Sequence, residues 1–261
     1  MSHVFDLTGR TAIVTGGSTL IGHGVVRALH SVGANVVVVD IDDAGGQAIV
    51  DELGDRAWFY HCDITNDAAL QELVDKAGRI DVLVNLAASY LDNGGETERD
   101  DWLTAFDINV VSGIVLTRKA RAKLAESGHG SVINFSSISS KVAQTGRWVY
   151  PACKAAIVSV TRSMAMDYAA DGIRVNSVSP GWTWSKIMDS LTGGNREKTD
   201  TVAAPFHFTG RVGDPDEIGR VVAFLASDAA SVVTGADWAA DGGYSAMGPE
   251  QAVPAIPKLM D

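Results

Sequence analysis

Short apolar runs alternate with longer stretches of mixed polarity along most of this chain. We expect seven of these runs to be β-strands, at 11–15, 35–40, 57–62, 81–85, 131–135, 174–178 and 237–241. A continuously apolar run is typical of a parallel strand that is buried on both faces. Strands that alternate with helices predict an α/β fold in one domain, 1–261, with a doubly wound parallel seven-stranded sheet and helices on both faces.

The stretches between the runs have the mixed polarity and the length of helices. Helices are expected at 25–32, 44–53 and 67–77, on a long stretch that includes Asn109 and ends near residue 124, and on the stretch that carries Tyr150 and Lys154.

Two segments depart from this pattern. Residues 186–211 lie between the sixth strand and the last helix, so they are expected to cover the sheet edge as a substrate lid; the plainer alternative is a surface excursion. The tail 245–261 contains 3 prolines. It cannot be one regular helix, and it is expected either to fray or to dock on another subunit.

Composition and charge exclude several classes of partner. With 46% hydrophobic residues and a net charge of −11, the chain can bury a large core but lacks the basic face that nucleic acids and anionic membranes require. No apolar run reaches about 18 residues, and the first ten residues lack the apolar core of a signal peptide. We therefore expect a soluble, cytoplasmic protein with a small-molecule substrate.

The two cysteines, Cys62 and Cys153, have no metal-binding spacing and are expected to be free thiols in a reducing compartment, with no metal site. Cys153 lies beside Lys154, which raises the hypothesis of a reactive thiol. Adjacent helical side chains point in different directions, so a structural role for Cys153 is favoured.

A glycine-rich turn follows the first strand, at residues 16–24, and a helix follows the turn. In this context the backbone N–H groups of the turn and of the helix N-terminus form a site for a pyrophosphate. A tightly packed turn with no ligand is the alternative from the turn alone.

The second strand ends in Asp40, about twenty residues after that turn. An acid at this place binds the adenosine ribose hydroxyls of NAD and repels the additional phosphate of NADP. Ile41 and two further aspartates follow, and no Arg or Lys stands where an NADP site needs a cation. The sequence therefore favours NAD, against the alternative of a solvated strand end.

The strongest candidate chemistry lies between Ser137 and Lys154. Tyr150 and Lys154 are four residues apart and share one helix face. An ammonium beside a phenol favours the phenolate, which makes the tyrosine a usable base. Ser137 follows a strand and can hydrogen-bond a substrate oxygen at the same point.

Taken together, these motifs resemble the short-chain dehydrogenase/reductase family from about residue 7 to residue 244. Asn109, Ser137, Tyr150 and Lys154 match the catalytic tetrad, and residues 241–243 match the end of the last strand. The positions that match the family's cofactor site, together with the tetrad's Tyr150 and Lys154, are Gly16, Ser18, Thr19, Leu20, Ile21, Asp40, Ile41, Asp63, Ile64, Asn85, Ala87, Pro180, Gly181, Thr183 and Ser185.

The resemblance implies an oxidoreductase that uses NAD and assembles as a homotetramer. It implies that Tyr150 exchanges the substrate proton, that Ser137 orients the substrate oxygen, and that Lys154 lowers the tyrosine pKa and holds the nicotinamide ribose. Asn109 would anchor a water that relays the proton. Leu20 replaces the middle glycine of the family's turn, and Leu86 and Ala88 replace Asn and Gly in its adenine-side segment.

The substrate is less well defined by the sequence. Candidate pocket residues are Ser139, Gln144, Trp148, Trp182, Trp184 and Phe206, with Tyr90 nearby. Aromatic walls suit a cyclic or aromatic substrate. No cation is clearly placed for a carboxylate, although Lys141, Arg147 and Lys186 lie close in the sequence, so the expected substrate is a neutral secondary alcohol.

Two alternatives remain open at this point. One is an NADPH-dependent ketone or 3-oxoacyl reductase, against which Asp40 argues. The other is a non-catalytic dinucleotide-binding or scaffold protein on the same fold, which Leu20 and Leu86 motivate.

Overall fold

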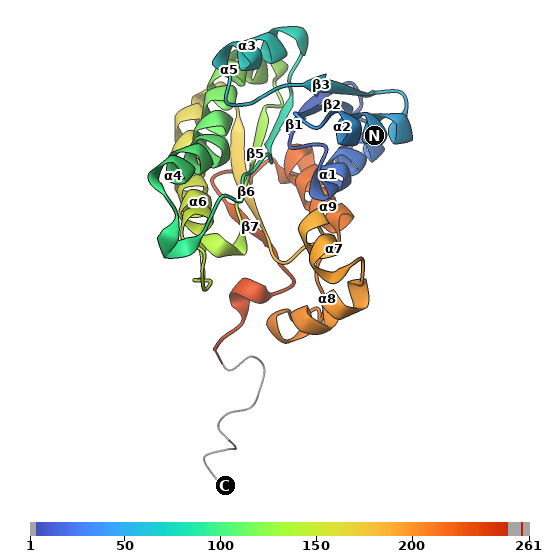
Figure 1. The fold of residues 1–261 in the computed structure, drawn as a ribbon. Helices are drawn as coiled ribbons and strands as arrows, with labels where there is room; N and C mark the ends of the chain where they lie inside the picture. Colours follow the sequence, from blue (N-terminus) through green and yellow to red (C-terminus); the bar gives the residue numbers. More distant parts are fainter. Residues whose placement is uncertain (1–3, 250–256, 258–261) are drawn as a thin grey trace.

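A computed structural model, which describes residues 4–249 and 257, shows a single parallel sheet between two layers of helices (Figure 1). The strand order is β3-β2-β1-β4-β5-β6-β7, and all six neighbouring pairs are parallel. The strands are β1 (Thr11–Thr15), β2 (Asn35–Asp40), β3 (Ala57–His61), β4 (Val82–Asn85), β5 (Ser131–Phe135), β6 (Arg174–Pro180) and β7 (Asp237–Ala240). The predicted fold class is confirmed.

The helices separate into two groups, each packed on one face of the sheet. They are α1 (Leu20–Ser31), α2 (Asp43–Leu53), α3 (Asp67–Lys76), α4 (Arg99–Phe106), α5 (Ser112–Ser127), α6 (Val149–Tyr168), α7 (Lys186–Thr192), α8 (Arg196–Ala203) and α9 (Pro215–Ala226). Side chains of α1, α2 and α9 fill one core, and those of α3, α5 and α6 fill the other. A smaller cluster joins α4 to α6.

Three predicted elements differ from the structure by more than one residue. Helix α1 begins at Leu20 rather than at 25, because the Thr19 hydroxyl accepts the N–H of Gly22 at 3.0 Å and caps the helix there. Strand β6 continues to Pro180 because it pairs with β7 up to Ala240. The long helical stretch is divided by one π-helical turn, Asp107–Val111, which holds Asn109.

The 186–211 segment forms α7, α8 and a short 3₁₀ turn, Ala204–Phe206. Figure 1 shows α7 and α8 together below α9, next to the end of the sheet to which β6 leads. Of the tail 245–261, only residues 245–249 and 257 are described, so the rest of that prediction lies outside the described residues. In the part of the chain that the structure describes, no helix is both long and apolar enough to cross a membrane.

Candidate active site

The glycine turn after β1 is built by close backbone contacts. Gly16 has φ +69°, and a Cβ there would lie 2.7 Å from the backbone of Ala87. A Cβ on Gly22 would lie 2.3 Å from the carbonyl oxygen of Gly16, so α1 starts directly against the turn. The N-terminus of α1 is thereby aimed across the turn, which is the arrangement that binds an anion.

Leu20 is the first residue of α1 and is 37% exposed. Its side chain therefore does not fill the turn. Ile21 and Ile64 pack against the two cores, so any contact of theirs with a dinucleotide would come from their backbone.

Asp40 ends β2 and lies next to the same turn. One of its carboxylate oxygens accepts the N–H of Ser18 at 3.0 Å, and the other accepts the N–H groups of Ile41 and Asp42 at 2.8 and 3.1 Å. No Lys or Arg in residues 4–249 forms an ion pair with Asp40. The side chain at this strand end is a carboxylate, an acceptor with negative charge, which fits the hydroxyls of a ribose and repels a phosphate.

The segment after β4 is tied to β1 rather than left open. Thr15 Oγ1 accepts the N–H groups of Leu86 and Ala87 at 3.2 and 3.4 Å. The Leu86 side chain is buried in the core that faces α1 and α9. The leucine that replaces the family's Asn at this position therefore has its side chain in the core and not at the cofactor turn. Asn85 donates its amide to Thr117 and Asn134.

Asp63, which the sequence predicts for the adenine side, follows the end of β3. Its carboxylate accepts the N–H and the hydroxyl of Thr65 at 2.9 and 2.8 Å. These hydrogen bonds hold the pKa of Asp63 below its usual value, so the acid is ionised at neutral pH.

Ser137, Tyr150 and Lys154 come together at the start of α6. The Lys154 ammonium is fully buried, 5.3 Å from the centroid of the Tyr150 ring, and it donates to the carbonyl oxygen of Phe135 at 2.9 Å. The Ser137 hydroxyl accepts the N–H of Ser139 at 3.2 Å. Ser136, the residue before it, donates its hydroxyl to the Lys154 carbonyl oxygen at 3.0 Å, which joins the serine segment to the helix.

The protonation of this group differs from the sequence expectation. Burial raises the pKa of Tyr150 above its usual value, and the neighbouring Tyr90 raises it further, while Ser137 and Arg147 lower it. Burial also lowers the pKa of Lys154 to about 8. The expected depression of the tyrosine pKa by Lys154 is not seen here, because both groups are desolvated and desolvation opposes charge on each.

Asn109 uses its side chain to hold the segment after β4. Its amide nitrogen donates to the carbonyl oxygens of Ser89 and Ala105 at 3.0 and 2.9 Å, and its oxygen accepts the N–H of Ser89 at 3.2 Å. A π-helical turn often marks a functional site. The side chain of Asn109 is fully engaged within the protein, so a relay water would have to use the backbone of this turn.

The residues predicted for the nicotinamide side lie at and after the end of β6. A Cβ on Gly181 would lie 2.8 Å from Cα of Asp241, so the chain passes close to the end of β7 here. Thr183 is buried and donates its hydroxyl to the Gly181 carbonyl oxygen at 3.2 Å. Ser185 caps α7, which fixes the start of the 186–211 segment beside this strand end.

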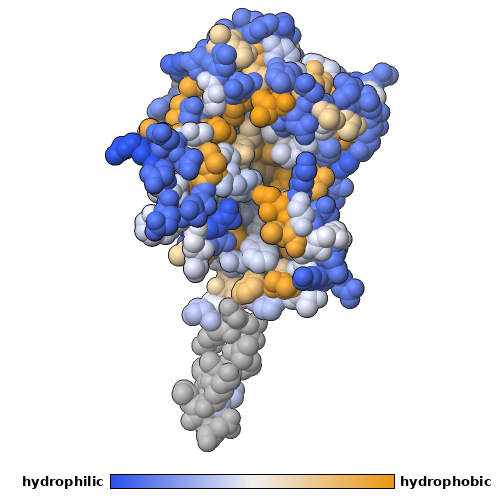
Figure 2. All heavy atoms as spheres, in the orientation of Figure 1, coloured by the Kyte–Doolittle hydropathy of each residue, from blue (hydrophilic) through white to orange (hydrophobic). Residues whose placement is uncertain are grey.

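The predicted pocket residues fall into separate groups. Ser139 donates its hydroxyl to Gln144 at 2.6 Å. Trp182 packs on Phe206 with ring centroids 6.0 Å apart. Trp148 is 60% exposed, and its ring lies beside Gly95, with no ring pair to another aromatic residue among those the structure describes. Figure 2, drawn in the orientation of Figure 1, shows that the visible face of the molecule is hollowed along its middle and has apolar side chains at the rim of the hollow.

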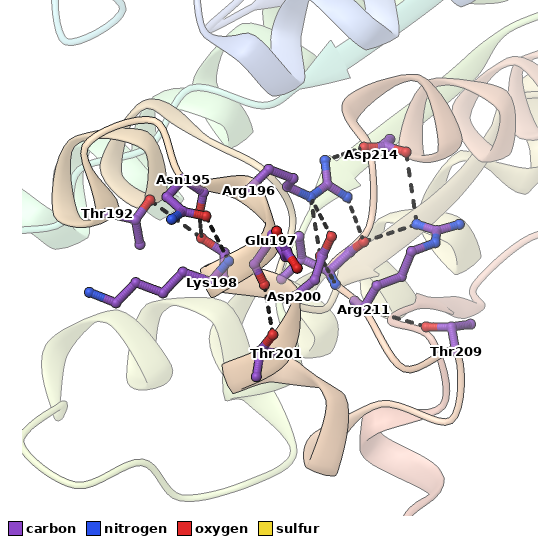
Figure 3. A network of polar contacts seen from close by, with 12 residues as sticks. Thr192, Asn195, Arg196, Glu197, Lys198, Asp200, Thr201, Thr209, Arg211 and Asp214 are labelled. Carbon is purple, nitrogen blue, oxygen red and sulfur yellow. Dashed lines mark hydrogen bonds and ion pairs between the residues drawn. The ribbon is translucent and has the colours of Figure 1, made fainter.

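Charged residues fasten the 186–211 segment to the start of α9 (Figure 3). Arg196 donates to Asp214 at 2.6 Å and to Asp200 at 3.1 Å, and its guanidinium carbon lies 5.4 Å from the centroid of the Trp184 ring. Arg211 binds Glu217 at 2.8 Å and holds the pKa of that carboxyl at about 2. Trp184 thus lies against this anchor and not with Trp182.

The cysteines behave as expected from the sequence. Both are free and buried, and burial raises the pKa of each thiol to about 11. Cys153 packs in the cluster between α4 and α6, which supports a structural role.

One residue of this site is not apparent from the sequence. Asp92, in the segment after β4, accepts the N–H of Trp148 at 3.0 Å, of Tyr150 at 2.9 Å and of Gly94 at 3.0 Å. These bonds lower the pKa of its carboxyl against the effect of burial. The N-cap residue of α6, Trp148, makes no side-chain cap. Asp92 takes the place of that cap, although it precedes Trp148 and Tyr150 by 56 and 58 residues in the sequence. The signal in the sequence was therefore a helix start that lacks a capping residue.

Replacing Asp92 by alanine should loosen the first turn of α6, where Tyr150 sits. Loss of an N-cap costs about 1 kcal/mol in stability, and we expect kcat to fall by about tenfold or more because Tyr150 loses its register. Asn at position 92 should restore much of both, since it keeps an acceptor. Thermal unfolding and steady-state kinetics measure the two effects. The matched control is Asp75→Ala on α3, and an Asp92→Ala enzyme as active as this control would contradict the positioning role.

Comparisons with known proteins agree with this geometry. A model of the family described as enoyl-(acyl carrier protein) reductase matches residues 17–245. A D-threitol dehydrogenase from Mycolicibacterium smegmatis is 33% identical over 249 residues, which cover 92% of this chain and 95% of the relative. A cis-4-hydroxycyclohexanecarboxylate dehydrogenase from Sinomonas cyclohexanicum is 35% identical, over 91% of this chain and 97% of the relative.

Among solved structures, a short-chain type dehydrogenase/reductase from Mycobacterium marinum superposes with a TM-score of 0.84 at 31% identity. The match covers 92% of this chain and 97% of that chain. These similarities run over nearly the whole length of each protein.

Proposed function

The chain belongs to the short-chain dehydrogenase/reductase family, and from that premise we propose that it is an NAD-dependent oxidoreductase that interconverts a secondary alcohol and its ketone. Its relatives are oxidoreductases of this family. The observation that supports catalysis is the grouping of Ser137, Tyr150 and Lys154 at one strand edge. The observation that supports NAD is the acidic end of β2.

The residues of the chain account for the proton. Tyr150, as the phenolate, takes the proton of the substrate hydroxyl and becomes the neutral phenol that burial favours, and Ser137 donates a hydrogen bond to the same substrate oxygen. Lys154 places a positive charge beside the phenol and lies where it would also hold the nicotinamide ribose. When bound, NAD supplies the acceptor for the hydride that leaves the substrate carbon.

The cofactor would be held by the turn and by the strand ends around it. The N–H groups at the start of α1 would face the pyrophosphate, because those of residues 17, 18, 19 and 22 donate within the chain, and Asp40 would accept the adenosine ribose hydroxyls. Asp63 would lie on the adenine side, and Thr183 and Ser185 would lie on the nicotinamide side. Leu20 does not obstruct this arrangement, because its side chain is partly exposed at the start of α1.

The substrate class follows from the walls of the site. Tyr90 and the pair of Trp182 and Phe206 support a cyclic or aromatic alcohol, and the 186–211 segment would cover it as a lid. The neutral class expected from the sequence requires a site without a free cation. Lys141 meets that requirement because it pairs with Asp237 at 3.0 Å, but Arg147 does not fit it.

A homotetramer in the cytoplasm is part of the same proposal. Large apolar side chains are exposed on α4, beside α5 and on α6, including Leu103, Val111 and Met166. Such side chains support packing against other copies of the chain. Light scattering after size exclusion would measure the mass of the assembly.

Titration with NADH and with NADPH, read by nicotinamide fluorescence, tests the cofactor. We expect NADH to bind about tenfold or more tightly than NADPH, because Asp40 accepts the ribose hydroxyls as a charged group. Asp40→Ser should remove most of that preference, and Asp55→Ser, an exposed acid after α2, should not.

Two other outcomes would direct the function elsewhere. A preference for NADPH would favour a ketone or 3-oxoacyl reductase. Binding of neither cofactor would favour the scaffold alternative and would contradict the dehydrogenase.

A further inference from the structure

Arg147 lies beside the phenol that the proposed function assigns as the acid and base. Its guanidinium carbon is 5.1 Å from the centroid of the Tyr150 ring and 6.0 Å from that of Tyr90. The two rings are stacked, with centroids 5.0 Å apart and an interplanar angle of 19°. One guanidinium is therefore in contact with both phenols.

This guanidinium has no acidic partner within the described part of the chain. No carboxylate of residues 4–249 lies at ion-pair distance from it, although six other arginines form such pairs. The Asp92 carboxylate accepts the N–H of Trp148, the residue next to Arg147, and its oxygens are taken by backbone groups. The Lys154 ammonium is committed to Phe135.

A half-buried guanidinium without a counter-ion is suited to an anion from outside the chain. Arginine presents a planar fork of N–H donors that matches a carboxylate in two parallel hydrogen bonds. Tyr90, which is 48% exposed, offers an aromatic face for the carbon skeleton next to that fork. The hydroxyls of Ser137 and Tyr150 mark the place of the reacting oxygen.

We propose that Arg147 binds a carboxylate of the substrate, so that the alcohol is a secondary hydroxy acid. The inference rests on the proposed function, since it takes Tyr150 as the group that meets the substrate hydroxyl. It replaces a neutral alcohol by an anionic one and makes Arg147 a specificity-determining residue. The overall charge of −11 does not oppose this, because the local charge at the site is what the substrate meets.

The test compares hydroxy acids with their own amides. Mandelate, 3-hydroxybutyrate and 4-hydroxycyclohexanecarboxylate place the carboxylate at different distances from the hydroxyl, and each amide has nearly the same shape without the charge. We would measure kcat and KM with NAD, and binding to the NADH complex by calorimetry. The wild-type protein should prefer at least one acid over its amide by about tenfold or more.

Arg147→Gln should remove that preference by raising KM for the acid about 10- to 100-fold. For the amide, kcat/KM at the plateau of the pH profile should change by less than about threefold, since the plateau is free of the effect of Arg147 on the pKa of Tyr150. Arg147→Lys should restore part of the binding of the acid, because it keeps the charge and loses the fork. Arg162→Gln is the matched control, because Arg162 is exposed on α6 and the substitution removes the same charge. The preference of this variant for the acid over its amide should equal that of the wild type.

Two results would overturn the inference. Either no acid exceeds its amide in the wild type, or Arg147→Gln lowers kcat/KM for the acid and for the amide equally when each is compared at the plateau of its pH profile. A shift of the pH profile alone is expected in either case, because Arg147 also lowers the pKa of Tyr150. Oxidation of the amides in either case leaves the proposed function standing. Binding of an acid that is lost in Arg147→Gln, with no alcohol oxidised, would support the anion site and contradict the oxidoreductase.

Discussion

Replacing Tyr150 by phenylalanine is expected to lower kcat about a thousandfold. The change removes one hydroxyl and with it the group that exchanges the substrate proton, and general acid–base catalysis contributes about 10²- to 10⁴-fold. The ring keeps its stack on Tyr90, so the fold and the cleft should not change. Fluorescence titration should therefore give an NADH dissociation constant within about a factor of two of the wild type. This factor corresponds to a change of less than about 0.5 kcal/mol in the binding free energy.

Tyr168→Phe provides the control for this change. Tyr168 is buried on the same helix, with the guanidinium of Arg121 4.5 Å above its ring centroid, and it lies in the core that faces α3 and α5. It should retain full turnover. Turnover by Tyr150→Phe at the level of this control would exclude Tyr150 as the acid and base.

Replacing Gly219 by alanine is expected to destabilise the protein by about 2 kcal/mol, even though alanine favours helices. A Cβ on Gly219 would lie 2.1 Å from the carbonyl oxygen of Gly24 on α1. No real Cβ tolerates that distance, so α1 and α9 would have to separate. Because α1 begins at the cofactor turn, we also expect weaker binding of NADH.

Arg220→Ala is the control for the helix, because Arg220 is the next residue on α9 and is exposed. Thermal unfolding should show the Gly219 variant about 5 °C lower than this control. Equal melting temperatures would mean that the close approach of α1 and α9 contributes little to stability. An unchanged NADH affinity would mean that this helix packing does not affect the cofactor turn.

Much of the fold follows from local patterns. A buried parallel strand is a continuous apolar run, whereas the helices between the strands have mixed polarity, so the two kinds of element can be told apart in the sequence. The edge that gathers Asp40, Asn85, Ser137 and Pro180 follows from topology alone. The sequence placed the start of α1 too late, because glycines at 22 and 24 are typical of a turn. In the structure both lie in the helix, where Gly22 packs against the cofactor turn and Gly24 packs against the start of α9. The boundary is therefore set by packing between elements distant in sequence.

The same reason explains what the sequence did not reveal about the site. Asp92 caps α6 across more than fifty residues, and no local rule predicts such a bond. Arg147 and Tyr90 are also distant in sequence, and only the fold shows that one guanidinium lies over both phenols. The pKa of Tyr150 depends on desolvation, which a spacing of four residues does not report.

The position of α9 has a consequence for how the chain acquires its structure during synthesis. Helix α1 is among the first elements to leave the ribosome, but the helix that covers it, α9, is among the last. At about 5–20 residues per second the delay is on the order of 10 s. Over that time the small-residue face of α1 has no native cover, so we expect this face to stay exposed in the nascent chain until residue 226 has emerged.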